Sequence, residues 1–133
     1  MMGRMTLPQK AASMQQQVDA FAMGDGSGQV AAIYNAECLH GPKAHGYTST
    51  VFPVGIAQAA TFDPELVYRM ARATSDDLRS SWNVGQDWSY CFAPDVNLIR
   101  DPRYGRGQEA WGEDPWLTSM LGYSFVVGLQ NGA

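Results

Sequence analysis

Apolar residues recur at two different spacings along the chain, and the change between them predicts helices alternating with strands. Helical spacing follows Thr6-Leu7-Pro8-Gln9, which has the form of a capping box, so a helix is predicted from about residue 7 to 22. The same spacing follows two acid–proline pairs, Asp63-Pro64 and Asp114-Pro115, which are typical helix starts. They predict one helix from 64 to about 80 and another from 115 onward.

Short apolar runs between these helices predict strands. The runs cover residues 30–34, 50–61 and 90–99, and Pro94 is expected to weaken the last of them. Alternating elements of this kind favour an α/β fold with a parallel sheet over a sandwich or a helical bundle. In such folds the loops that follow the strands build the functional site. We therefore expect function in the two loops richest in polar groups, 37–45 and 100–114.

Composition and charge exclude several kinds of partner. The chain has 133 residues, of which 45% are hydrophobic and 17% charged, as in a globular protein. A net charge of −4 and only two lysines argue against nucleic acid. No apolar run approaches the roughly 18 residues that span a bilayer, so no membrane partner is expected. The first ten residues lack the apolar region of a signal peptide, which leaves the compartment unknown.

Neither the cysteines nor the histidines form a recognisable metal motif. Cys38 and Cys91 are far apart and lack a CxxC partner, so two buried free thiols are expected. Glu37, His40 and His45 are possible zinc ligands, but their spacing fits no standard zinc motif. No metal and no cofactor are predicted.

Each loop offers groups that suit a sugar and also has a purely structural interpretation. In the first loop, the Glu37 carboxylate can accept hydrogen bonds from vicinal hydroxyls, or Glu37 and His40 can satisfy neighbouring backbone or each other. In the second loop, three arginines and four acids can neutralise one another. Arg106 has glycine on both sides, which allows close approach, and its guanidinium can grip hydroxyls at fixed geometry. The glycines here do not form a GxGxxG phosphate motif, so a nucleotide is disfavoured.

The order of several stretches resembles family 3 of the glycoside hydrolases, which includes β-glucosidases and β-xylosidases. The stretches are MTLPQK (5–10), AECLHG (36–41), FPVGIAQAATFDPELV (52–67), APDVNLIRDPRYGRGQEAWGEDPWL (93–117) and VGLQNG (127–132). The resemblance implies that residues 1–133 form the first few βα units of an incomplete TIM-type (β/α)₈ barrel. The remainder of that barrel and a second α/β domain are then absent from the chain.

The resemblance also implies a retaining, exo-acting glycosidase whose catalytic groups are not in this chain. The family's nucleophile aspartate comes from a later strand and its acid/base glutamate from the following domain, and neither motif occurs here. No residue of the chain is therefore assigned as catalytic, and the chain itself is expected to be inactive. Glu37 and Arg106 match substrate-binding positions of the family. Four further residues match its motif and are expected to support the site: His40, Glu109, Glu113 and Asp114.

One departure from the commonest family pattern bears on the substrate. Many family glucosidases have aspartate at the position of Glu37, whereas glutamate is familiar in xylosidase-like members. A β-xylosidase is thus favoured over a β-glucosidase, with an oligosaccharide or glycoside as partner. Tyr104 stands where tryptophan is common, which keeps an aromatic ring. The alternative function is a non-catalytic, carbohydrate-binding remnant.

Overall fold

The computed structural model describes residues 6, 8, 9, 12, 35–42, 49–83 and 90–131. The chain divides into two compact units, Met1–Ile33 and Tyr34–Ala133, and each is considered by itself. In the first unit, the side chain of Gln9 accepts a hydrogen bond of 2.9 Å from the Thr6 backbone N–H, which is one half of the predicted capping box. Residues 8, 9 and 12 are helical, as expected for the helix predicted at 7–22. The other residues of that helix and the strand expected at 30–34 lie outside the described residues.

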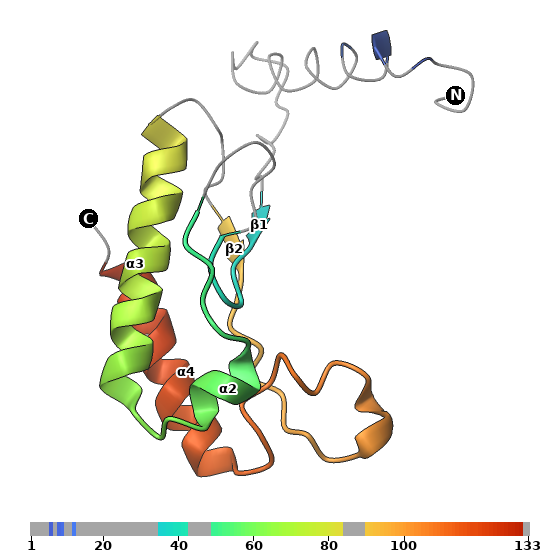
Figure 1. Cartoon of the computed structure of the whole chain (residues 1–133), viewed down its shortest axis with the longest axis vertical. Coiled ribbons are helices and arrows are strands. Elements are labelled where there is room, and N and C mark those ends of the chain that lie inside the picture. The colour runs from blue at the N-terminus through green and yellow to red at the C-terminus, as the bar shows by residue number, and fades with distance from the viewer. Residues whose placement is uncertain are drawn as a thin grey trace, which may run out of the picture. The chain divides into compact units, whose positions relative to one another are not determined.

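The second unit combines a small parallel sheet with a helical layer (Figure 1). Its elements are β1 (Asn35–Glu37), α2 (Gly55–Ala59), α3 (Pro64–Asn83), β2 (Tyr90–Phe92), the 3₁₀ helix η2 (Pro102–Tyr104) and α4 (Pro115–Gln130). β1 and β2 pair in parallel, with Ala36 opposite Cys91. The predicted parallel sheet is therefore confirmed for β1 and β2, although β1 covers residues that follow the strand predicted at 30–34 and includes Glu37, which was expected in the loop. α3 and α4 pack against each other, and α2 contacts α4.

Both helices predicted from acid–proline pairs are confirmed, and their caps have the expected chemistry. The Asp63 carboxylate accepts a hydrogen bond of 3.0 Å from the Leu66 N–H at the start of α3. Asp114 accepts one of 2.9 Å from the Trp116 N–H at the start of α4. These carboxylates satisfy amides that have no partner within the helix and lie near the positive end of its dipole. Helix α3 continues three residues beyond the predicted end, to Asn83.

The strand predicted at 50–61 is wrong, because this segment packs against a loop and not against a sheet. Residues 51–54 have no regular structure, and α2 follows them. The N–H of Ile56 donates to the Gln108 carbonyl at 3.2 Å. A Cβ atom at Gly55 would collide with the Glu109 carbonyl oxygen, so only glycine allows this approach. Small residues that look like a buried strand instead bring the start of α2 into close contact with the loop at Gln108 and Glu109.

The second sheet strand is shorter than predicted. We expected a strand over residues 90–99, but β2 ends at Phe92. Pro94 lacks an N–H and cannot donate to a strand ladder, so the chain leaves the sheet there. The polar residues that follow are consequently part of the loop that borders the site.

The core of the second unit lies between α3 and α4. Leu121 and Val67 are completely buried, and Trp111 packs beside Phe125 with ring centroids 6.0 Å apart. A Cβ atom at Gly128 would lie only 2.5 Å from the Tyr68 carbonyl oxygen, so glycine is required where α4 crosses α3. Interlocking at this distance fixes the helical layer behind the sheet.

Large apolar side chains remain exposed on the described residues outside this core. Trp116 is 74% exposed, Tyr123 70%, Phe62 73% and Val51 75%. Among the described residues β1 and β2 pair only with each other, so no strand in that part of the chain covers the other edge of either one. Uncovered edges and apolar patches promote self-association.

The isolated chain is therefore expected to bind a hydrophobic dye and to self-associate. Dye fluorescence and light scattering measure both properties. Trp116→Gln and Tyr123→Gln together should reduce the dye signal, because they remove two of the most exposed rings. A monodisperse monomer with a cooperative melt and no dye binding would contradict the expectation that further sequence covers these faces.

Candidate functional site

The carboxyl ends of β1 and β2 and the loop around Arg106 border one concave region. Its volume is about 490 Å³. It is lined by Glu37, Leu39, Tyr90, Cys91, Phe92, Ala93, Pro94, Asp95 and Arg106. Parallel strands end at the same edge of a sheet, which is why Glu37 and the residues after β2 meet. The structure thus brings Glu37 and Arg106 to a single cleft, while their roles in binding remain predictions.

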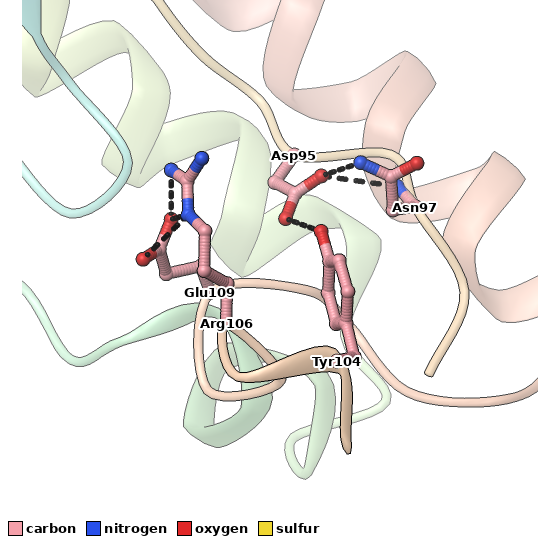
Figure 2. Close-up of polar contacts among 5 residues, drawn as sticks. All are labelled: Asp95, Asn97, Tyr104, Arg106 and Glu109. Atoms are coloured by element: carbon pink, nitrogen blue, oxygen red, sulfur yellow. Dashed lines mark hydrogen bonds and ion pairs between the residues drawn. The ribbon is translucent and has the colours of Figure 1, made fainter. Parts of the chain in front are cut away.

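Glu109 holds the guanidinium of Arg106. The Arg106 Nε–H donates to both carboxylate oxygens of Glu109, at 3.1 and 3.0 Å, and Nη2 donates to Oε2 (Figure 2). This pairing, and more weakly the charge of Asp95, raises the pKa of Arg106. Arg106 therefore stays a cation. No described residue accepts from its Nη1 group, which can still donate to a ligand.

A second polar cluster joins the loop to the segment after β2. Tyr104 donates its hydroxyl to Oδ2 of Asp95 at 3.1 Å, and Oδ1 of Asp95 accepts from the side chain of Asn97 at 2.6 Å (Figure 2). Partial burial, followed by the interactions with Asp95, raises the pKa of Tyr104. The phenol consequently remains a donor at neutral pH. Sequence reasoning did not identify Asp95, because nothing local to it indicates that it lines the same cleft as Glu37.

Two aromatic rings also line the cleft and were not singled out from the sequence. Tyr90 and Phe92 are 53% and 56% exposed, and their rings meet edge to face with centroids 5.7 Å apart. They are two residues apart on β2, so both project from the same face of the strand. This two-residue spacing was the signal in the sequence that would have paired them.

Buried Gln58 fixes the loop that follows β1. Its amide nitrogen donates to the carbonyls of Leu39, at 3.2 Å, and Pro53, at 2.8 Å. Its amide oxygen accepts from the Trp111 indole N–H at 3.3 Å. A side chain that is 2% exposed thereby ties a cleft-lining residue to the core.

Of the four residues predicted to support the site, one contacts Arg106 and the other three lie outside the cleft. Glu109 contacts Arg106 directly, as described above. His40 contributes a backbone carbonyl that accepts from the Phe52 N–H at 2.8 Å. Asp114 caps α4, and Glu113 is exposed beside it. His40, Glu113 and Asp114 do not line the cleft.

The prediction of two free thiols is wrong, because Cys38 and Cys91 form a disulfide. Parallel pairing sets Ala36 opposite Cys91, and the Cα atoms of the two cysteines are 5.6 Å apart. This separation lies within the range of disulfides, which distance along the sequence does not reveal. The bond fixes the segment just after Glu37 to the strand that forms the cleft wall.

The described residues contain no group of three or more side chains suited to hold a metal ion. His45, the third member of the alternative zinc set, lies outside them. No helix in the described part of the chain is long and apolar enough to cross a membrane.

Comparison with known proteins identifies the family. The family model described as the glycosyl hydrolase family 3 N terminal domain matches residues 1–133. A xylan 1,4-beta-xylosidase of Xylanibacter ruminicola is 40% identical over 71% of the chain, and a beta-xylosidase of Formosa agariphila is 36% identical over 98% of it. The chain therefore belongs to glycosyl hydrolase family 3. It spans 12% of the length of the first relative and 17% of the second.

Solved structures of family members have a similar arrangement. A family 3 exo-beta-xylosidase bound to a xylobiose aziridine probe superposes with a TM-score of 0.67, at 33% identity over 73% of this chain and 14% of its own. A mutant beta-glucosidase from Listeria innocua bound to laminaribiose gives a TM-score of 0.62, at 34% identity over 80% of this chain and 13% of its own. Both kinds of sugar specificity thus occur on folds like this one.

Removing the disulfide is expected to destabilise the region around the cleft. The two cysteines are 53 residues apart, and a loop of that size corresponds to roughly 4 kcal/mol of unfolding free energy in the chain-entropy model. Cys91→Ser should lower the urea midpoint of unfolding, followed by tryptophan fluorescence. Cys38→Ser is the control and should shift the midpoint equally, since it removes the same bond. An unchanged midpoint in either variant would contradict the prediction.

Proposed function

We propose that this chain forms the sugar-binding part of a retaining, exo-acting β-glycosidase that releases terminal β-linked sugars, with β-xylosides preferred over β-glucosides. In this proposal residues 1–133 are the first few βα units of a (β/α)₈ barrel. The observation that carries it is the meeting of Glu37 and Arg106 in one cleft of a family 3 domain. The names of the relatives support the xyloside preference.

The cleft groups are complementary to a sugar ring. Glu37 accepts hydrogen bonds from hydroxyls, whereas Arg106, held by Glu109, donates them from fixed positions. The exposed rings of Tyr90 and Phe92 offer apolar faces to the C–H bonds of a pyranose. Acceptors, donors and apolar faces together suit an uncharged sugar.

The bond-breaking groups come from outside residues 1–133 in this proposal. A retaining mechanism needs a carboxylate nucleophile and a carboxylic acid/base about 5–5.5 Å apart. The chain contributes by holding and orienting the sugar that these groups attack, and such positioning lowers the entropic part of the barrier.

Replacing Arg106 tests this assignment in the full-length protein that carries the chain. Arg106→Ala should lower kcat/KM for an aryl β-xyloside by roughly 10- to 100-fold, because charged hydrogen bonds contribute about 1.5–3 kcal/mol each. Arg103→Ala is a matched control, since Arg103 lies on the same loop, is 89% exposed and pairs with Asp101. Its kcat/KM should equal that of the wild type.

Three results would contradict the proposal. Equal losses in both arginine variants would remove Arg106 from the subsite. A wild-type protein that binds sugar without hydrolysing any aryl glycoside would favour the non-catalytic remnant. A wild-type preference for β-glucosides would overturn the xyloside preference alone.

A further inference from the structure

Asp95 has a carboxylate in the cleft to which the proposed function assigns no role in sugar binding. It follows β2 and lines the same concave region as Glu37 and Arg106. It forms no ion pair with a described residue, since the described ion pairs join Arg103 to Asp101 and Arg106 to Glu109. Its negative charge is therefore not neutralised by an ion pair with Arg106. A half-buried carboxylate in this position calls for donors.

The donors that the described residues supply occupy most, but not all, of the hydrogen-bond acceptor sites on the Asp95 carboxylate. Oδ1 accepts from the Asn97 backbone N–H at 3.2 Å and from its side-chain amide at 2.6 Å. Oδ2 accepts only the Tyr104 hydroxyl, at 3.1 Å. A carboxylate has about four acceptor sites, so these three bonds leave about one, on Oδ2.

The three bonds also fix where that remaining site lies. Figure 2 shows Tyr104 and Asn97 reaching the carboxylate from separate segments, which restrains both the position and the rotation of the side chain. An acceptor held in this way loses little conformational entropy when it binds a ligand. It differs in this respect from a flexible surface carboxylate.

We propose that Asp95 is a specificity-determining residue of the cleft, which accepts a hydrogen bond from one hydroxyl of the bound sugar through Oδ2. The inference rests on the proposed function, because it takes the ligand to be a sugar. Asp95 and Glu37 give the cleft two carboxylates, while Arg106, the one cation among its described lining residues, is already paired with Glu109. The ligand that suits this charge is a neutral sugar with free hydroxyls and not a uronic acid.

Deoxy sugars provide the test, performed on the full-length protein that carries this chain. Aryl β-D-xyloside and its 2-, 3- and 4-deoxy analogues are compared by kcat/KM, and D-xylose and the matching deoxy sugars by calorimetric binding. Asp95→Asn keeps the size of the side chain and removes its charge. It should weaken the parent sugar by roughly 10- to 100-fold and one of the deoxy analogues by less than about 3-fold. That analogue identifies the hydroxyl that Asp95 binds.

Two further variants separate this role from a general effect on the loop. Tyr104→Phe removes only the hydroxyl that holds Oδ2, and should show the same pattern across the analogues with a smaller loss. It also keeps the test open if Asp95→Asn does not fold. Asp101→Asn removes a carboxylate from the same loop that lies outside the cleft, and asparagine still caps η2. This control should bind every sugar as the wild type does.

The outcomes distinguish the inference from the function on which it rests. Three results would each overturn the role of Asp95. They are equal losses on the parent sugar and all deoxy analogues, no loss in Asp95→Asn or in Tyr104→Phe, and an equal loss in Asp101→Asn. Sugar binding without turnover in the wild type would overturn the glycosidase proposal, while the binding data would still decide on Asp95. A wild-type protein that neither binds nor hydrolyses these sugars would overturn both.

Discussion

Residues 1–133 expressed alone are expected to hydrolyse neither aryl β-xylosides nor aryl β-glucosides. In the proposed function, turnover by a full-length glycosidase that carries the chain should exceed that of the isolated chain by at least roughly 10⁶-fold, the lower end of enzymatic rate enhancements. In the proposed function the chain supplies binding groups only, and binding groups without a nucleophile offer no covalent route. Release of nitrophenol by the two proteins at equal concentration gives the comparison.

The carboxylates of the cleft are the groups that would overturn this expectation. Glu37 and Asp95 both line it, and two carboxylates are what a glycosidase requires. Asp95, however, already accepts three hydrogen bonds from Asn97 and Tyr104, which hold its carboxylate in place as an acceptor. Turnover by the isolated chain that disappears in Glu37→Gln or in Asp95→Asn would mean that the chain carries its own catalytic pair.

The second large effect concerns the choice between a pentose and a hexose, and it depends on one methylene of Glu37. Glutamate carries its carboxylate about one carbon further into the cleft than aspartate. In the proposed subsite this carboxylate still reaches the 4-hydroxyl of a xyloside but crowds the hydroxymethyl group of a glucoside. Glu37→Asp in the full-length protein should shift the xyloside-to-glucoside ratio of kcat/KM toward glucoside by roughly 10- to 200-fold, which is what one methylene typically contributes.

Glu37→Gln is the matched control for this experiment. It keeps the length of the side chain and removes the charge, so it should weaken both substrates and leave their ratio nearly unchanged. An unchanged ratio in Glu37→Asp would mean that the backbone adjusts to the longer acid. The position of Glu37 would then not determine the xyloside preference.

The local chemistry of the sequence was sufficient to locate the two long helices. Asp63 and Asp114 with the prolines that follow them act within a single turn, so their effect does not depend on the rest of the fold. The parallel pairing of strands was also predictable, because it follows from the order of elements. Family resemblance pointed to Glu37 and Arg106, and the structure places both on one cleft.

Contacts between distant segments were decided only by the tertiary structure. The segment around Gly55 looks like a strand in sequence but fits against the backbone of Glu109 as a short helix. Cys38 meets Cys91 because Ala36 and Cys91 are neighbours in the sheet, not because of their spacing along the chain. Asp95 joins Glu37 at the cleft for the same reason. Hydrophobic period and capping act over a few residues, whereas strand register and loop packing depend on the whole unit, and these determine which side chains share a site.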